Sequence, residues 1–147
     1  MARSKLSGVA ITDDARAVDP AAAAALYVEL GWGMPARYSA ARLRRSLAHC
    51  DVVLAAHDED GALVAVLRAL TDRAIDTKVL DLVIAPEYQR QGLGLAMMKR
   101  LARHPAVKGT TIYFETEKKN FAFAAKAGYV KRGGLTVFKS RRSSPRG

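Results

Sequence analysis

A glycine-containing loop joins an apolar strand directly to an amphipathic helix, and this junction constrains the fold more than any other feature of the chain. Residues 78–84 form a nearly continuous apolar run, typical of a buried strand, and Pro86 ends it. After the loop, Leu93, Met97 and Leu101 recur every four residues with basic residues between them, which predicts a helix over 92–104. The junction therefore predicts a mixed α/β domain in which this helix packs against this strand.

The loop between the two elements, residues 85–94, has the chemistry of an anion site. Gly92 and Gly94 carry no side chain and let a ligand approach the backbone closely. The first amides of the following helix lack intrahelical partners, and the helix dipole adds positive charge. Arg90 could add a charge-assisted contact. The loop lacks the Lys-Ser/Thr of a nucleotide P-loop and is no GxGxxG opening. It predicts a pyrophosphate at the helix start, with a simple glycine-rich turn as the alternative.

The remaining pattern predicts one domain, without internal repeats or an interdomain linker. Asp19-Pro20 and Ser39 are helix-start signals, and helices are expected over 20–30, after Ser39, and over 118–127. Further strands are expected at 9–11, 51–56, 62–70, 110–114, 129–131 and 135–139, with turns at 58–61 and at Gly133-Gly134. We therefore expect a single domain over residues 1–140 and a flexible basic tail over 141–147.

Composition limits the classes of protein that remain. No apolar run approaches the roughly 20 residues of a membrane span, and the N-terminus has no apolar h-region of a secretory signal. The lone Cys50 cannot form an internal disulfide, so the cytosol is the expected location. The three histidines show no metal-ligand spacing, so no metal is expected. The net charge of +10 fits either a solvated basic surface or attraction for a polyanion such as coenzyme A or nucleic acid.

Several segments together resemble one family. Residues 89–94, QRQGLG, resemble the Q/R-x-x-G-x-G/A signature of the GNAT superfamily of acyl-CoA N-acyltransferases. Residues 80–86 look like the strand before that signature, and FAAKAGY at 123–129 looks like the later F-Y-x-K-x-G-F phrase. Residues 30–33 and 60–61 are similar to features of a small bacterial and plant-plastid branch. The similarity runs from about residue 9 to residue 138.

This resemblance implies a fold and a cofactor site. The implied fold is α/β (α+β), with a mostly antiparallel sheet of about six to seven strands, splayed in the middle and flanked by about four helices. Acetyl-CoA would lie in the splay as a co-substrate. Main-chain groups of Leu82, Val83 and Ile84 would pair with its pantetheine arm. The remaining implied contacts are the pyrophosphate loop and three residues further along the chain: Gln89, Arg90, Gln91, Gly92, Leu93, Gly94 and Leu95, then Asn120, Phe123 and Lys126.

The implied reaction is direct attack of a primary amine on the thioester, and it needs a base. An alkylamine with a pKa near 10.4 is neutral only about once in a few thousand molecules at pH 7. Asp81, an acid inside an otherwise apolar strand, is the main candidate to take its proton. The alternative is a structural Asp at the strand edge that pairs with an Arg or faces solvent, and Glu115 and Glu117 are weaker candidates for the base. Where the family has its usual general-acid Tyr, this chain has Ala124. Tyr88 is the proposed substitute, with Tyr113 or water as alternatives.

Three functions remain open at this point. The first is an N-acetyltransferase acting on an amine, with acceptor contacts from residues 31–38, whose Trp32, Met34 and Tyr38 favour an apolar or aromatic acceptor. The second is an acetyltransferase acting on charged transfer RNA or another nucleic-acid-linked amine, suggested by the basic tail and the arginines after Ser39. The third is a non-catalytic acyl-CoA-binding module, suggested by Ala124. A homodimer is expected by analogy alone, and no membrane contact is expected.

Overall fold

The sheet has five strands in the described part of the chain, residues 6–141 of this computed structural model. They lie in the order β1-β2-β3-β4-β5, with the first four antiparallel and β5 parallel to β4. The strands are β1 Ala10–Thr12, β2 Val52–His57, β3 Leu63–Thr71, β4 Asp76–Ile84 and β5 Thr111–Tyr113.

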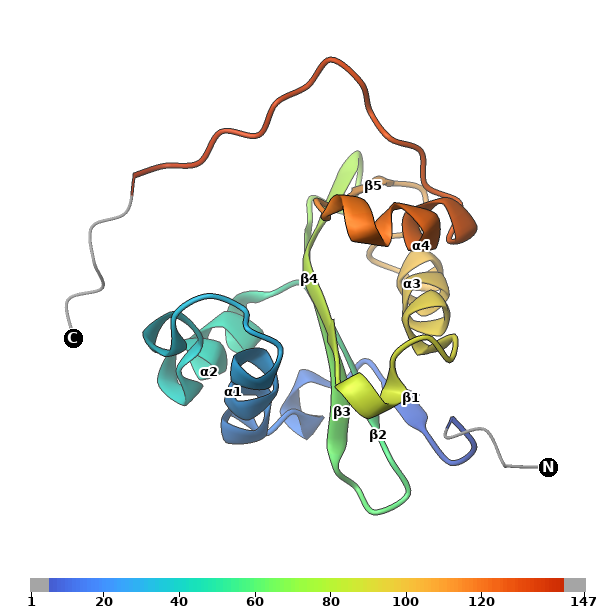
Figure 1. The fold of residues 1–147 in the computed structure, drawn as a ribbon. Helices are drawn as coiled ribbons and strands as arrows, with labels where there is room; N and C mark the ends of the chain where they lie inside the picture. Colours follow the sequence, from blue (N-terminus) through green and yellow to red (C-terminus); the bar gives the residue numbers. More distant parts are fainter. Residues whose placement is uncertain (1–5, 142–147) are drawn as a thin grey trace.

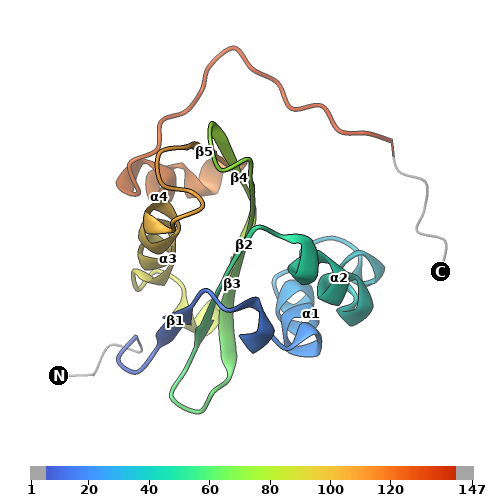
Figure 2. The same cartoon turned by 180° about the vertical axis from the view of Figure 1, so that it is seen from behind.

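Four α-helices cover the two faces of this sheet. Helices α1 and α2 lie on one side, and α3 and α4 on the other (Figures 1 and 2). Their bounds are α1 Pro20–Glu29, α2 Ala40–His49, α3 Leu93–Arg103 and α4 Phe121–Lys126. Short 3-10 turns join the elements: η1 Ala15–Ala17, η2 Pro35–Tyr38, η3 Pro86–Tyr88 and η4 Lys118–Asn120. Among residues 6–141, no helix has the length and hydropathy needed to cross a bilayer.

The helix starts predicted from the sequence are confirmed. Asp19 accepts a hydrogen bond from the Ala21 amide at 3.2 Å, with Pro20 as the first residue of α1. Ser39 accepts one from the Arg42 amide at 3.4 Å. Each cap satisfies an amide that the first turn of a helix leaves without a partner.

The core lies on both faces of β2 and β3, which are buried between the two helical layers. Leu54 and Leu67 are fully buried at the centre of the sheet. Tyr27 of α1 and Met97 of α3 close the core from opposite sides, each with 0 % exposure. The two faces of β4 are therefore separate environments, one under α1 and α2 and the other under α3.

The predicted splay is present between β4 and β5. The two strands pair only at Asp76–Lys78 of β4, leaving residues 79–84 without a partner on that edge. The opening starts beside a bulge, because Arg68 of β3 pairs with Asp81 while the next β3 residue pairs with Val79, so that Leu80 is the extra residue. The mixed, splayed α/β fold expected from the sequence is confirmed, although the described strand count is five.

The predicted last hairpin explains this lower count. Residues 129–131 and 135–139 are not strands, although Gly133-Gly134 does form a turn. Val130 and Phe138 are 92 % and 91 % exposed. A two-stranded hairpin is only marginally stable without a sheet or helix to pack on, and these residues have neither. Of the tail expected at 141–147, all but Arg141 lies outside the described residues.

Candidate active site

The anion loop holds its shape through backbone geometry and two glutamine side chains. Gly92 precedes α3 in the left-handed conformation, with a φ of 91°, and offers no side chain to the first turn. Arg90 also has a positive φ of 60°, which is uncommon for a residue with a side chain. The side-chain Nε2 of Gln89 donates to the Ile84 carbonyl oxygen at 2.9 Å, and the side-chain Nε2 of Gln91 donates to the Glu87 carbonyl oxygen at 2.7 Å. The loop is thus braced on the strand before it, and the start of α3 stays free of side-chain caps.

Close packing joins the strand, the loop helix and α4. A Cβ atom added to Gly94 would lie 3.1 Å from Ile84 Cδ1 and 3.2 Å from Phe123 Cε2. Because few real Cβ contacts are that short, a larger residue at this position would push the Ile84 or Phe123 side chain aside by a few tenths of an ångström. The structure therefore brings together Ile84 of β4, Gly94 of α3 and Phe123 of α4.

The other expected cofactor residues are less tightly grouped. Leu82 is half-buried and Val83 is buried on β4, and Leu93 is buried at the start of α3. Asn120 donates from Nδ2 to the Thr116 hydroxyl at 3.0 Å, within its own loop. Lys126 is exposed at the end of α4. Leu82 and Val83 lie on the unpaired part of β4, and the contacts of all these residues with a cofactor stay predictions.

Asp81 lies in a buried polar network on the opposite face of β4. Its side chain is 1 % exposed and forms an ion pair with Arg68 of β3. Tyr27 of α1 donates its hydroxyl hydrogen to Asp81 Oδ1 at 2.5 Å, and Arg68 Nε donates to the Tyr27 oxygen at 3.1 Å. Arg68 Nη1 also donates to Ser46 of α2 at 2.5 Å. The network ties β3 and β4 to both helices on this face.

Burial and charge set the protonation states of this network. Burial, followed by the negative charge of Asp81, raises the pKa of Tyr27 far above its usual value. Burial alone would lower the pKa of Arg68, but the hydrogen bond and charge of Asp81 outweigh it and the net pKa is raised. The phenol thus stays neutral and the guanidinium stays charged. Asp81 thus already accepts hydrogen bonds from Tyr27 and Arg68. This is the Arg-paired arrangement that the sequence left open as the alternative to a catalytic base.

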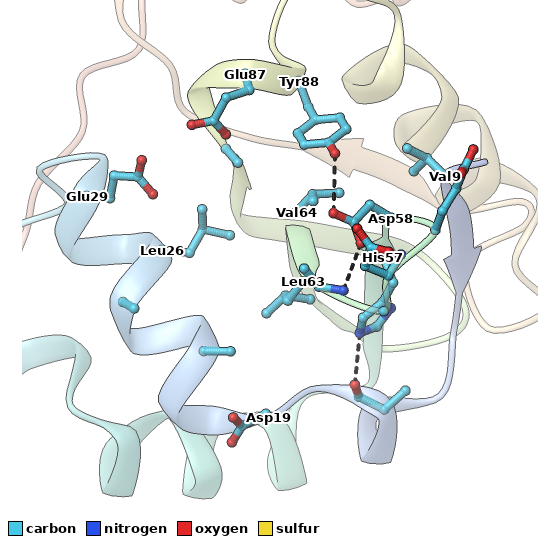
Figure 3. A pocket seen from close by; sticks show the side chains of 18 of the residues that line it. Val9, Asp19, Leu26, Glu29, His57, Asp58, Leu63, Val64, Glu87 and Tyr88 are labelled. Atoms are coloured by element: carbon cyan, nitrogen blue, oxygen red, sulfur yellow. Dashed lines mark hydrogen bonds between the residues drawn. The ribbon is translucent and has the colours of Figure 1, made fainter. Parts of the chain in front are cut away.

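Tyr88 lies away from Asp81, on η3 between β4 and the anion loop. Its hydroxyl points to Asp58 in the β2–β3 turn, at 3.4 Å from Oδ2, as Figure 3 shows. Burial and the nearby Asp58 charge raise its pKa. The structure therefore does not bring the two proposed catalytic side chains into contact. Tyr113, the alternative tyrosine, ends β5 where the two strands diverge, and its oxygen lies 3.4 Å from Nη1 of Arg132.

A groove of about 880 Å³ runs between α1 and the β2–β3 hairpin, with Tyr88 and Glu87 on its rim (Figure 3). Its lining includes six carboxylates and neither lysine nor arginine, in a chain of net charge +10: Asp19, Glu29, Asp58, Glu59, Asp60 and Glu87. Asp81 and residues 79–84 do not line it. The groove is therefore a local negative region between α1, the β2–β3 hairpin and η3. Within residues 6–141 no cluster of three His, Cys, Asp or Glu side chains is placed to hold a metal ion.

Sequence reasoning missed the partners of Asp81. Tyr27 was assigned only to a helix face, and Arg68 lies in a strand that is otherwise apolar. A charged residue in each of two buried strands is the available signal, because a buried charge requires an opposite charge nearby. The pairing itself depends on strand register, which the bulge at Leu80 determines.

Comparisons with known proteins agree with this geometry. Residues 18–129 match the model of the acetyltransferase (GNAT) family. A curated relative, serotonin N-acetyltransferase 2, chloroplastic, from Oryza sativa subsp. japonica, is 34% identical over 119 residues, which are 74% of this chain and 58% of that protein. Another, GCN5-related N-acetyltransferase 1, chloroplastic, from Arabidopsis thaliana, is 32% identical over 67% of this chain and 50% of its own length. The chain thus spans about half the length of these curated relatives.

Solved structures share the fold. A GNAT family acetyltransferase from Streptococcus pneumoniae TIGR4 has a TM-score of 0.70 at 26% identity, covering 90% of this chain and 99% of that one. The aminoglycoside N-acetyltransferase AAC(6')-Iy, solved in complex with CoA, has a TM-score of 0.70 at 12% identity, covering 91% of this chain and 95% of that one. With the family model matching more than half of its residues, this chain belongs to the acetyltransferase (GNAT) family.

Proposed function

We propose that this protein transfers an acetyl group from acetyl-CoA to a primary amine. One observation carries the proposal: an unpaired strand edge at residues 79–84 leads directly into a helix N-terminus with a left-handed glycine cap. An unpaired edge can hydrogen-bond an extended chain that carries amides, and pantetheine is such a chain. The helix start can hold a pyrophosphate. The CoA complex of a protein with the same fold supports this assignment.

The residues of this chain would hold the cofactor mainly through the backbone. Leu82, Val83 and Ile84 would offer main-chain groups to the pantetheine arm. In this structure the Ile84 carbonyl already accepts from Gln89, so this contact would be exchanged on binding. The pyrophosphate would lie on the amides of residues 89–95, with Arg90 adding charge. Asn120, Phe123 and Lys126 would contact the cofactor from η4 and α4.

Asp81 is our proposed acceptor of the amine proton. Its side chain is 1 % exposed, so the amine or a water molecule must enter the network before the proton can move. The proposed route into the network passes the α1–α2 connection and reaches Tyr27 first. The Tyr27 ring lies 4.5 Å from that of Tyr38 and 6.1 Å from that of Trp32, and both of these residues belong to the connection. A neutral amine formed there would attack the thioester directly.

Tyr88 is our proposed donor of a proton to the departing thiolate. An acid must keep its proton at working pH, and the raised pKa of Tyr88 meets this requirement. To act, its hydroxyl would have to leave Asp58 and turn toward the splay. Tyr113 is the alternative, since it already lies where β4 and β5 separate.

An aromatic amine fits the acceptor side best. Trp32 and Met34 are 37% and 75% exposed on the α1–α2 connection, and the Trp32 ring lies edge-on to Tyr27. An apolar ring could pack on these side chains while its amine faces the network. The relative from Oryza sativa is named for serotonin, an arylalkylamine, which supports the same substrate class. The six carboxylates of the groove would attract such a cationic amine despite the net positive charge.

The other two functions have less support. Arg42, Arg44 and Arg45 are exposed on α2, as transfer RNA binding would require. The solvent-facing side of an amphipathic helix is ordinarily charged, so their exposure by itself does not favour RNA binding. The acyl-CoA-binding module is favoured only by Ala124. We keep the cytosol as the proposed location, from the single cysteine alone; the curated relatives are named as chloroplastic proteins.

Calorimetry and a thiol-release assay test the proposal together. Acetyl-CoA should bind the unmodified protein, and Gly94→Val should weaken binding at least about tenfold, or about 1.4 kcal/mol, because the new side chain would displace Ile84 and Phe123. Gly133→Val is the matched control, since nothing lies within 4 Å of a Cβ there. Arylalkylamines should then release CoA thiol. Absence of binding heat would refute the cofactor site, and binding without release from any amine would favour the acyl-CoA-binding module.

A further inference from the structure

The charges of this chain are unevenly divided along the sequence. Residues 85–141 carry twelve lysines and arginines and three acidic side chains, whereas residues 6–84 carry eight and eleven. The first of these segments includes α3 and α4, which cover one side of the sheet, and the second includes α1 on the other side (Figures 1 and 2). Because α1 also borders the groove with six carboxylates, the two sides of the sheet differ in charge.

The charged side chains on the exposed face of α3 are all basic. Lys99, Arg100 and Arg103 are exposed, and the sequence of α3 contains no acidic residue. Within residues 6–141, none of the three lies in an ion pair. Residues three or four positions apart on a helix lie about 5–6 Å apart at Cβ, so the three charges form one patch. A charged outer face is ordinary for an amphipathic helix, and this patch becomes informative only together with its neighbours.

The neighbouring η4 and α4 extend the patch and add an aromatic ring. Lys118 on η4 and Lys126 at the end of α4 are exposed. Phe121, the first residue of α4, is 39% exposed, and Nζ of Lys131 lies 5.4 Å from the centroid of its ring. The close approach of α4 to Gly94 holds the two helices together. Basic side chains and an exposed ring therefore share one side of the domain.

A single strand of nucleic acid matches a surface of this kind. Its phosphates are attracted to basic side chains, and its bases stack on an exposed ring whatever their sequence. A lipid bilayer matches less well, because a helix that lies on a membrane inserts large apolar side chains, and α3 exposes none. The nearby carboxylates of Glu115 and Glu117 are each paired with a lysine, at 2.6 Å and 3.2 Å. This pairing reduces their repulsion of phosphate.

We propose that the α3–α4 face, defined by Lys99, Arg100, Arg103, Lys118 and Phe121, binds single-stranded nucleic acid. The strand lies along the exposed side of α3, with one base stacked on Phe121. The exposed arginines of α2 do not take part, because α2 lies on the side of the sheet where the carboxylates of the groove repel phosphate. The bound strand therefore leaves the groove free. This binding does not depend on the proposed acetyl transfer.

Fluorescence anisotropy with a labelled oligouridylate of about 16 nucleotides tests the proposal. The unmodified chain should bind it, with an affinity that falls as salt is added. Two triple variants each replace three exposed helical cations by glutamine: Lys99→Gln/Arg100→Gln/Arg103→Gln on α3 and Arg42→Gln/Arg44→Gln/Arg45→Gln on α2. The α3 variant should bind at least about tenfold more weakly, and its slope of log affinity against log salt should be smaller by about 2. The α2 variant is the matched control and should change neither quantity.

Two outcomes of this experiment would overturn the proposal. One is an unmodified chain that does not bind the oligonucleotide at low salt. The other is an equal loss in both triple variants, because net charge rather than the α3–α4 face would then govern binding. Acetyl-CoA calorimetry on the α3 variant should give an unchanged affinity, so failure of the nucleic-acid face and failure of the cofactor site are distinguished.

The exposed ring is tested separately. Phe121→Ala should weaken oligonucleotide binding about tenfold without changing the salt slope, because it removes a stacking surface and no charge. Phe121→Tyr should restore the affinity, which a general loss of folding would not allow. Sedimentation with phosphatidylglycerol vesicles tests the competing partner. A protein that sediments with these vesicles and does not bind the oligonucleotide would make the face a lipid contact and refute the proposal.

Discussion

The two sides of β4 differ in what supplies their polar groups. On the α1 and α2 side, Asp81, Arg68 and Tyr27 satisfy one another, and no buried side-chain polar atom in the described residues lacks a partner. On the β5 side, residues 79–84 and the first turn of α3 offer main-chain groups that no neighbouring strand pairs. The first region is closed by its own side chains, whereas the second is open and built from backbone.

This difference indicates how each region tolerates change. A buried ion pair is sensitive to loss of either charged member, since the remaining charge is left without its partner. A backbone site is insensitive to most side-chain changes and sensitive to those that alter backbone geometry. The following predictions test the contrast, beginning with the largest effect.

Asp81→Asn should have the largest effect. If Asp81 accepts the amine proton, kcat should fall by roughly 10²- to 10⁴-fold. Leaving Arg68 without its partner should also lower the free energy of unfolding by about 3 kcal/mol, measured by urea denaturation. Asp76→Asn, on the same strand but exposed, is the control and should change neither kcat nor the free energy of unfolding. A variant that loses stability but keeps the kcat of its folded fraction would make Asp81 purely structural.

Gly92→Val should weaken acetyl-CoA binding about tenfold without contacting the cofactor through a side chain. A left-handed conformation costs a residue with a Cβ about 1–2 kcal/mol, and the φ of 91° at Gly92 lies in that region. The Cβ itself would meet only Leu6, at 4.0 Å. Calorimetry should show a smaller loss for Gly92→Asn, since Asn tolerates this conformation better.

The control for Gly92 is another glycine of similar geometry. Gly109 has a φ of 89° and nothing within 4 Å of an added Cβ. Gly109→Val should cost similar stability yet leave acetyl-CoA affinity unchanged. Equal affinity losses for both variants would mean that global destabilisation, rather than loop geometry, weakens binding.

Tyr88→Phe should lower kcat about tenfold, because a CoA thiolate is a good leaving group and needs only modest help from an acid. The loss should be clearest at alkaline pH, where water protonates the thiolate least readily. Tyr113→Phe is the paired comparison, measured by the same thiol-release assay. If Tyr113→Phe shows the loss and Tyr88→Phe does not, the acid is at the splay rather than on η3.

Tyr27→Phe should have the smallest effect at neutral pH and a distinct signature at high pH. Burial and the Asp81 charge raise the pKa of Tyr27 in the folded protein, while in the unfolded chain it ionises near pH 10. The unfolded state therefore loses a proton that the folded state keeps, and stability should fall as pH rises above about 10. Tyr27→Phe should reduce this slope by up to about 1.4 kcal/mol per pH unit in chemical denaturation. An unchanged slope would contradict the neutral, buried phenol.

Local signals in the sequence were sufficient for the starts of α1 and α2 and for the loop geometry before α3. The caps at Asp19 and Ser39 act within a few residues, so their residue types alone indicate the helix starts. Gly92 and Gly94 likewise report a backbone requirement that is local to the loop. Long-range features were less accessible, because strand register depends on contacts between residues that are distant in the sequence.

The sequence by itself determined the order of elements up to α4 and the loop geometry before α3, because these follow from periodicity and from where a chain needs glycine. The splay of the sheet was implied by the family resemblance. Only the tertiary structure decided that Asp81 is paired with Arg68 and Tyr27 and that the last hairpin stands open. The bulge at Leu80 sets which β3 residue faces Asp81, and the hairpin has no packing partner within its own chain. Both outcomes depend on contacts that no local stretch of residues specifies.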